Sequence, residues 1–262
     1  VSITDMFLAG ILPGILIGVT LIGLVWTFST VKGYGNQVSK SFGAWATDVW
    51  VALRDAWLAL LTPVIILGGI YGGVFTPTEA AVIAVVYTLF LGLFVYRELK
   101  LSMLPRLFYE AAYTTAVVMI IIAFASVLAY VLILYRVPTM ISNYVVGVTD
   151  DPLVFMLIVN ILLLIVGTIL EGVPAIIIVT PILAPLANTY GIDPVHFGVV
   201  VIANLALGMV TPPVGANLFI ACSIFEVKMD ALMRPLTWFL TVLIVDMLII
   251  SYIPWLSTVF IH

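Results

Sequence analysis

The chain has 262 residues, of which 64% are hydrophobic and only 8% are charged. Soluble domains carry about 25% charged residues, so this composition indicates a chain solvated by lipid and excludes an ordinary soluble domain. A net charge of −4 without a block of Lys or Arg argues against a nucleic-acid surface, and the single cysteine, Cys222, excludes a disulfide framework. The chain begins at Val1 without the basic stretch of a signal peptide, so we expect a fragment of a longer membrane protein.

Residues 1–60 are predicted to hold a scaffold helix and an interfacial arm helix. Residues 3–29 form one apolar run with a Pro-Gly pair near its start, which indicates a spanning helix with an irregularity there. After a polar loop, residues 42–60 alternate tryptophans and charged side chains at helical spacing. This pattern favours an amphipathic helix in the membrane interface. The alternative is the polar end of the next spanning helix.

Residues 61–152 are predicted to form scaffold and connecting transmembrane helices. The run Thr76-Pro77-Thr78-Glu79 matches a capping box with proline at the first helical position. It predicts a helix to about residue 96 and explains Glu79 as a cap. Leu104 to Leu134 predicts one long helix, and residues 139–149 a short interfacial segment.

Residues 153–225 contain two helix-breaking interruptions within an apolar stretch. Residues 153–169 and 175–190 are each slightly short for a span and flank Glu171-Gly172-Val173-Pro174, which predicts a re-entrant hairpin over 153–190. Residues 194–225 predict a discontinuous helix, interrupted at Thr211-Pro212-Pro213-Val214-Gly215. Backbone freed at membrane depth persists only where it is buried in protein or lines a polar cavity, so the two breaks predict a binding site. Residues 226–262 hold the last transmembrane helix.

The distribution of basic residues predicts the orientation of the helices. Cytoplasmic loops are enriched in Lys and Arg, and with 153–190 as a hairpin eight of the nine basic residues fall on one side, with only Arg136 opposite. The eight are Lys32, Lys40, Arg54, Arg97, Lys100, Arg106, Lys228 and Arg234. The hairpin is therefore expected to open from the outside with its tip in the membrane.

The second break has a predicted cation site on one side. Pro212 and Pro213 lack an N–H, so the carbonyls four residues earlier, on Gly208 and Met209, lose their helical partners. Free carbonyls together with the Thr211 hydroxyl form a hard-oxygen site that suits sodium. The alternative is a kinked helix without a ligand.

The other side of the break has a predicted anion site. Ala216, Asn217 and Leu218 open a new helix, whose N–H groups and positive dipole end attract a carboxylate. Glu171, at the predicted hairpin tip, is either a functional carboxylate or an N-cap of the following helix.

Other polar residues favour structural roles. Asp246 is expected to pair two helices, and His196 to be a cap or interface residue rather than a proton carrier. Cys222 is expected to be an inert buried thiol. The chain has no His-Glu-x-x-His motif and no phosphate-binding glycine loop, so no enzyme is indicated.

Three segments resemble one family. GGIYGGVFTPTEAAVIAVVY (68–87), FLAGILPG (7–14) and the block from 171 to 219 with its Thr-Pro-Pro-Val-Gly-x-Asn-Leu motif are similar to the large membrane subunit of the tripartite ATP-independent periplasmic (TRAP) transporters. The resemblance spans essentially the whole chain but only the C-terminal half of that subunit. The N-terminal half of the subunit, with its own hairpin and helix break, has no counterpart here.

This resemblance implies half of an inverted-repeat elevator transporter, a bacterial inner-membrane importer of organic anions such as C4-dicarboxylates or sialic acids, coupled to sodium. It implies four partners besides lipid: a small membrane subunit, a periplasmic solute-binding protein, the N-terminal half, and the anion itself. The candidate substrate-binding residues are Glu171, Asn204, Ala216 and Asn217. The candidate sodium-binding residues are Gly172, Val173, Gly208, Met209, Thr211, Pro212 and Gly215.

Two alternatives to this function remain open. A proton-coupled transporter of the same broken-helix plan would require Glu171 or Asp246. A membrane scaffold that transports nothing would contain the same breaks as packing kinks only.

Overall fold

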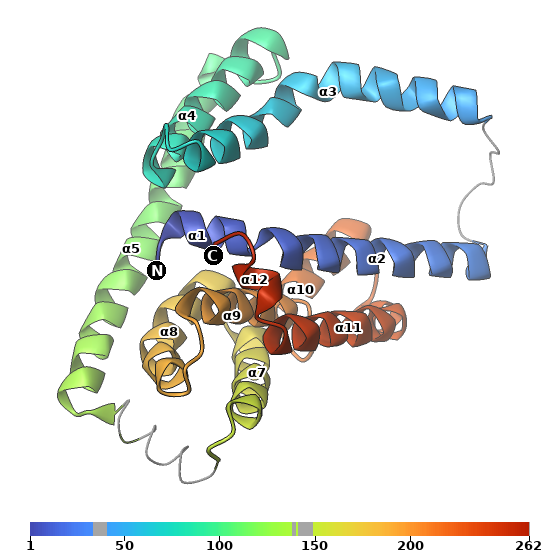
Figure 1. Cartoon of the computed structure of the whole chain (residues 1–262). Coiled ribbons are helices and arrows are strands. Elements are labelled where there is room, and N and C mark those ends of the chain that lie inside the picture. The colour runs from blue at the N-terminus through green and yellow to red at the C-terminus, as the bar shows by residue number, and fades with distance from the viewer. Residues whose placement is uncertain (34–40, 138–139, 141–148, 262) are drawn as a thin grey trace. The chain divides into compact units, whose positions relative to one another are not determined.

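The computed structural model describes residues 1–33, 41–137, 140 and 149–261, and every regular element among them is helical. Seven helices of this described part are long and apolar enough to cross a membrane (Figure 1). The predicted all-α, multi-pass class is confirmed at this level. The residues group into two compact units, one formed by Val1–Lys32 with Ala116–His262 and the other by Gly33–Thr115.

The 33–115 unit begins with α3 (Phe42–Tyr71), a single helix of 30 residues. The polar segment 42–60 and the apolar segment after it are therefore continuous, as in the alternative in which 42–60 is the polar end of the next helix. Pro63 lies inside α3. A proline removes one backbone hydrogen bond, and α3 continues on both sides of it.

The turn from α3 to α4 (Pro77–Phe90) is closed by backbone contacts at Gly69. Its carbonyl accepts from the N–H groups of Val74 and Phe75 at 2.9 and 3.1 Å, and the Phe75 ring lies where a Cβ of residue 69 would stand. The predicted capping box is confirmed, because the Thr76 N–H donates to Glu79 at 2.8 Å and the Glu79 N–H donates to Thr76 at 3.3 Å. A π-helical turn, Leu91–Val95, extends α4 nearly to the predicted end.

Helix α5 (Leu104–Leu134) has the predicted bounds and follows a short 3₁₀ turn, Leu101–Met103. Its first residues belong to the 33–115 unit and its residues from Ala116 onward to the other unit. The predicted interfacial segment 139–149 lies outside the described residues except for Met140 and Thr149.

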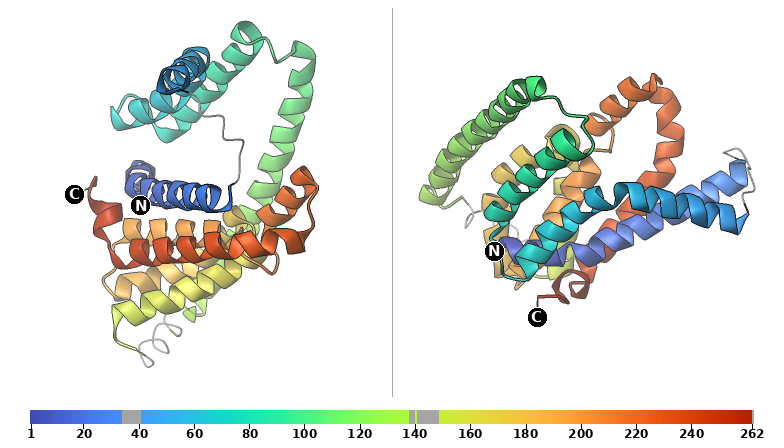
Figure 2. Two further views of the ribbon diagram at one scale, coloured as in Figure 1. Left: turned by 90° about the vertical axis from the view of Figure 1, so that its right-hand side faces the viewer. Right: turned by 90° about the horizontal axis from the view of Figure 1, so that it is seen from above.

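The second unit is built around α9. This helix packs against α7, α8 and α11 as well as α1 and α12, and Figures 1 and 2 show it among them. The core of this unit contains the fully buried side chains of Phe155, Leu163, Val200 and Leu205. Besides the part of α5 from Ala116 onward, the helices of this unit are α1 (Ile3–Ala9), α2 (Ile11–Lys32), α7 (Pro152–Ile169), α8 (Gly172–Thr189), α9 (Pro194–Gly208), α10 (Ala216–Phe225), α11 (Met229–Tyr252) and α12 (Trp255–Thr258).

Two buried polar side chains tie these helices together. The Thr20 hydroxyl of α2 lies 2.6 Å from Oδ2 of Asp246 on α11, which confirms that Asp246 pairs two helices. The His196 ring of α9 lies 2.7 Å from the Ser257 hydroxyl through Nδ1 and 3.2 Å from the Ser251 carbonyl through Nε2. His196 is therefore an interface residue, as predicted.

The pair of Thr20 and Asp246 yields a stability prediction. Thr20→Val leaves the carboxyl of Asp246, which is 1% exposed, without its partner. We expect a loss of about 1–3 kcal/mol in unfolding free energy, because a buried polar group without a partner retains its full desolvation cost. The double variant Thr20→Val/Asp246→Leu removes both groups and is expected to be more stable than Thr20→Val alone. Thermal unfolding of the purified permease in detergent measures both, and equal stability of the two variants would contradict the pairing.

Candidate functional site

The first predicted break is shorter than the sequence indicated. Helix α7 ends at Ile169 and α8 begins at Gly172, so only Leu170 and Glu171 separate them. The prediction that residues 171–174 are non-helical is wrong for the last three. Pro174 lies in the first turn of α8, where its missing N–H has no helical partner to lose. The candidate sodium ligands Gly172 and Val173 are in that same turn.

The second break lies against the first. Helix α9 ends at Gly208 and α10 begins at Ala216. The N–H of Gly215 donates to the carbonyl of Thr168, the penultimate residue of α7, at 3.2 Å. A Cβ built on Gly172 would stand 3.5 Å from Sδ of Met209. The structure therefore brings together the end of α7, the start of α8 and the 209–215 segment. The seven candidate sodium residues lie at the start of α8, at the last residue of α9 and in the 209–215 segment.

The free carbonyls of the second break are not those that the sequence indicated. The carbonyl of Gly208 accepts from the Thr211 N–H at 2.9 Å, and that of Met209 accepts from the Asn217 N–H at 3.1 Å. A local turn thus replaces the bond lost at Gly208, and the N–H of Asn217, eight residues further on, replaces the one lost at Met209. Within the described part of the chain no hydrogen bond reaches the carbonyls of the next five residues, Val210, Thr211, Pro212, Pro213 and Val214.

The start of α10 is also partly occupied. The Asn217 N–H is used by Met209, and the Leu218 N–H donates to the Gly215 carbonyl at 2.8 Å. Among the three N–H groups predicted to be available, that of Ala216 alone has no partner in the described residues. The Asn217 side chain is exposed. Any anion here would be bound by one backbone N–H, the amide of Asn217 and the helix dipole.

Glu171 and Asn204 occupy very different surroundings. Glu171 stands at the N-cap position of α8 but its side chain makes no capping hydrogen bond, so the capping alternative does not hold for the carboxylate. It is exposed at the α7–α8 gap. Asn204 is 0% exposed, and its Nδ2 donates to Oδ1 of Asn160 at 2.9 Å and to the Val200 carbonyl at 2.8 Å. Both amide hydrogens are thus used between α7 and α9 rather than at the break.

The sequence analysis missed Asn160. This residue is 1% exposed, and its Oδ1 accepts from Asn204 and from the Ser251 hydroxyl of α11, the latter at 3.0 Å. The other atoms of the two amides, Nδ2 of Asn160 and Oδ1 of Asn204, have no hydrogen-bond partner among the residues that the structure describes. The sequence could have pointed to Asn160, because it is the one polar side chain in the apolar run from Leu153 to Val166.

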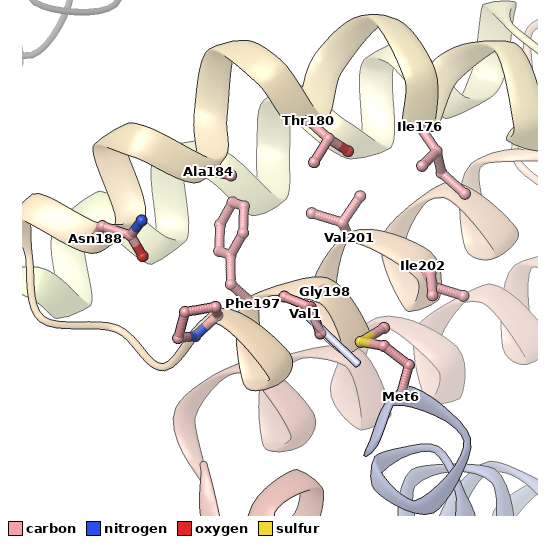
Figure 3. A pocket seen from close by; sticks show the side chains of 11 residues that line it. Val1, Met6, Ile176, Thr180, Ala184, Asn188, Phe197, Gly198, Val201 and Ile202 are labelled. Carbon is pink, nitrogen blue, oxygen red and sulfur yellow. The ribbon is translucent and has the colours of Figure 1, made fainter. Parts of the chain in front are cut away.

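A cavity of about 500 Å³ lies between α8, α9 and the start of α1 (Figure 3). Thr180 and Asn188 are the polar side chains that line it, among apolar neighbours such as Ile176, Phe197 and Val201. None of the candidate site residues lines this cavity. With no cationic side chain and few polar atoms it does not suit an organic anion, and we place no substrate there.

In the described part of the chain, no group of three or more His, Cys, Asp or Glu side chains could hold a metal ion. The candidate cation ligands are therefore the oxygens of the second break. Comparison with known proteins then places the chain: the family described as "Tripartite ATP-independent periplasmic transporter, DctM component" matches residues 1–256. The chain belongs to this family. The recognition of a TRAP large subunit from the three sequence segments is confirmed.

Several relatives match nearly the whole chain. The isethionate TRAP transporter permease protein DctMQ of Oleidesulfovibrio alaskensis is 40% identical over 97% of the chain and 39% of its own length. The C4-dicarboxylate large permease protein DctM of Pseudomonas aeruginosa is 40% identical over 98% of the chain and 59% of its own length. The sialic acid large permease protein SiaM of Vibrio cholerae is 36% identical over 97% and 58%. The chain thus spans under two thirds of the length of these relatives.

The turn at Gly215 yields a prediction on this site. Gly215 has φ +51°, and a Cβ there would stand 2.9 Å from the carbonyl oxygen of Thr211. We expect Gly215→Ala to lower the unfolding free energy by about 1–2 kcal/mol, because the left-handed conformation disfavours a Cβ. Gly14→Ala is the control, since a Cβ at Gly14 meets nothing within 4 Å. Thermal unfolding of both variants measures the difference, and an unchanged Gly215→Ala would contradict the backbone described here.

Proposed function

We propose that this chain forms part of the membrane permease of a sodium-coupled secondary importer of organic acid anions. The observation that carries the proposal is the run of five unpaired carbonyls from Val210 to Val214 beside the α7–α8 gap. These five residues are half-buried or exposed. At membrane depth no water pairs with an exposed carbonyl, so five consecutive acceptors without a partner in the described residues favour a ligand that supplies positive charge or hydrogens.

Sodium suits this break because its ligands are hard oxygens. Carbonyl oxygens and a hydroxyl select hard cations over metals that prefer thiolate or imidazole. The Thr211 hydroxyl donates to the Leu207 carbonyl at 2.7 Å, so its oxygen lone pairs remain available. Carbonyls of Gly208 and Met209 each accept one hydrogen bond and have a second lone pair. The candidate sodium residues of the second break therefore fit a cation, together with the free carbonyls of 210–214. Gly172 and Val173 fit less well, because the first turn of α8 presents unpaired N–H groups rather than carbonyls.

An organic anion is the proposed substrate because of the names of the relatives and the charge of this region. The three relatives above are named for isethionate, C4-dicarboxylate and sialic acid. No Lys or Arg occurs between Arg136 and Lys228. A bound anion would then depend on the start of α10 and on the neighbouring sodium for positive charge, which makes the binding of the two ions mutually favourable.

The proposed architecture is a re-entrant hairpin made of α7 and α8 and a discontinuous helix made of α9 and α10. Helices α7 and α8 have 18 residues each, and the charge distribution along the chain favours a return to the starting side. We propose that these four helices move together in an elevator mechanism in the bacterial inner membrane. The partners would be the remaining part of the large permease, a small membrane subunit and a periplasmic binding protein.

Sodium binding is tested first by thermal unfolding of the complete permease complex. We expect NaCl but not KCl, at equal ionic strength, to raise the unfolding temperature in proportion to the logarithm of the concentration above the Kd, because only the folded state holds the site. Equal effects of both salts would leave no sodium site and would favour the membrane scaffold.

Transport is tested with the variant Thr211→Val/Asn217→Leu in the same complex. It removes the hydroxyl and the exposed amide next to the free carbonyls, and we expect sodium-driven uptake of the anion to fall by about 10²-fold or more, since each lost charge-assisted contact costs about 1.5–3 kcal/mol. The matched control is Thr237→Val on α11, whose hydroxyl makes the same kind of bond to the carbonyl four residues earlier. Wild-type uptake by the double variant would contradict the site, and uptake driven by a pH gradient without sodium would favour proton coupling.

A further inference from the structure

The end of α7 and the end of α9 approach each other at two glycines. A Cβ built on Gly208 would stand 2.5 Å from Cα and from the carbonyl carbon of Gly167, and a Cβ on Gly167 would stand 3.1 Å from Cα of Gly208. Real Cβ atoms essentially never approach within 3.0 Å of another heavy atom. The two backbones are therefore in direct contact at this point, and an added methyl group at Gly208 meets main chain, which moves only if a whole helix moves.

This crossing lies directly before both breaks. Gly167 is followed by Thr168, whose carbonyl accepts the Gly215 N–H, and Gly208 is followed by the segment with the free carbonyls. On the other side of the crossing, the bond between Asn160 and Asn204 fixes the same two helices against each other at 2.9 Å. The helices are thus held on one side by an amide pair and on the other by a backbone hydrogen bond between the breaks.

We propose that Gly167 and Gly208 are positioning residues. They hold the α7–α8 gap and the 209–215 segment in one arrangement, so that a ligand bound at one segment stabilises the other. This inference rests on the proposed function, since it concerns the sodium site of the preceding subsection. The glycines need not touch the ion. They set the distance between the two backbone segments that do.

Gly208→Ala tests the proposal, with Gly198→Ala as a matched control on the same helix. Both substitutions replace a helical glycine by the best helix former, so the change in helix propensity is the same. A Cβ at Gly198 meets only the flexible end of the Met6 side chain, at 2.9 Å, which can turn away. The difference between the variants therefore reports the backbone contact alone.

The measured quantity is the sodium concentration for half-maximal uptake by the reconstituted complete complex. We expect Gly208→Ala to raise it by roughly tenfold, within the range of about 5–150-fold usual for coupled sites, and Gly198→Ala to leave it within about twofold, inside the scatter of uncoupled substitutions. In parallel, we expect sodium to slow hydrogen exchange at the Gly215 amide in the wild type and in Gly198→Ala, but not in Gly208→Ala. If Gly208 had only a structural role, Gly208→Ala would lower the unfolding temperature without sodium. It would change neither the sodium concentration for half-maximal uptake nor the effect of sodium on hydrogen exchange at Gly215.

Each outcome decides between the two proposals. A wild type without any sodium effect overturns the proposed function and the positioning role with it. A wild type with a sodium effect that Gly208→Ala retains unchanged overturns the positioning role alone. Where Gly208→Ala does not fold, Gly167→Ala decides by the same criteria, because its Cβ is 3.1 Å from the opposing backbone and requires a shift of only a few tenths of an ångström.

Discussion

The contact between α7 and α9 is the constraint on which the second unit depends. These helices cross closely enough for their backbones to touch at Gly167 and Gly208, and the buried side chains of Phe155, Leu163 and Leu205 fill the interface on either side. In lipid, where water exclusion does not drive helices together, close packing of small residues and interhelical hydrogen bonds hold them in place. One helix break follows the crossing directly after α7 and the other directly after α9. Contact between the two helices, rather than the loops, therefore fixes the position of one break relative to the other.

The polar groups of this unit are arranged in a chain through its core rather than scattered. Asn204 bonds to Asn160, Asn160 accepts from Ser251, and the Ser251 carbonyl lies beside the His196 ring. This series of hydrogen bonds links α7, α9 and α11 without a formal charge. A neutral network is far less costly to bury than an ion pair, which is compatible with a unit that keeps its internal packing while its surroundings change. Asp246 and Thr20 extend the same principle to α2.

The features of the sequence that act locally were predictable, and those that depend on tertiary contacts were not. The capping box at Thr76, the full length of α5 and the ends of α9 and α10 follow from prolines, caps and apolar length within a few residues of each site. The partners of the freed carbonyls do not follow from local sequence. The chain after Met209 turns back, and the Asn217 N–H donates to the Met209 carbonyl, which was predicted to be free. The join of α7 to α8 was placed too late for a related reason, since Pro174 is compatible with a first helical turn as well as with a break. Asn204 was named as a candidate substrate-binding residue, whereas its Nδ2 donates to Asn160 on another helix.

The absence of basic residues between Arg136 and Lys228 sets the logic of the proposed coupling. A carboxylate that enters a low-dielectric site without a cationic side chain loses more solvation energy than one helix dipole and a single free N–H return. In the proposed site, a sodium ion held by the carbonyls of 210–214 would lie on the other side of Gly215 from the start of α10 and would supply positive charge next to the anion. In the proposed site the anion would bind weakly by itself and more tightly with sodium, and the reciprocity of binding free energies would give sodium the same gain from the anion. In such a site the lack of a basic side chain would tie the movement of the anion to that of sodium.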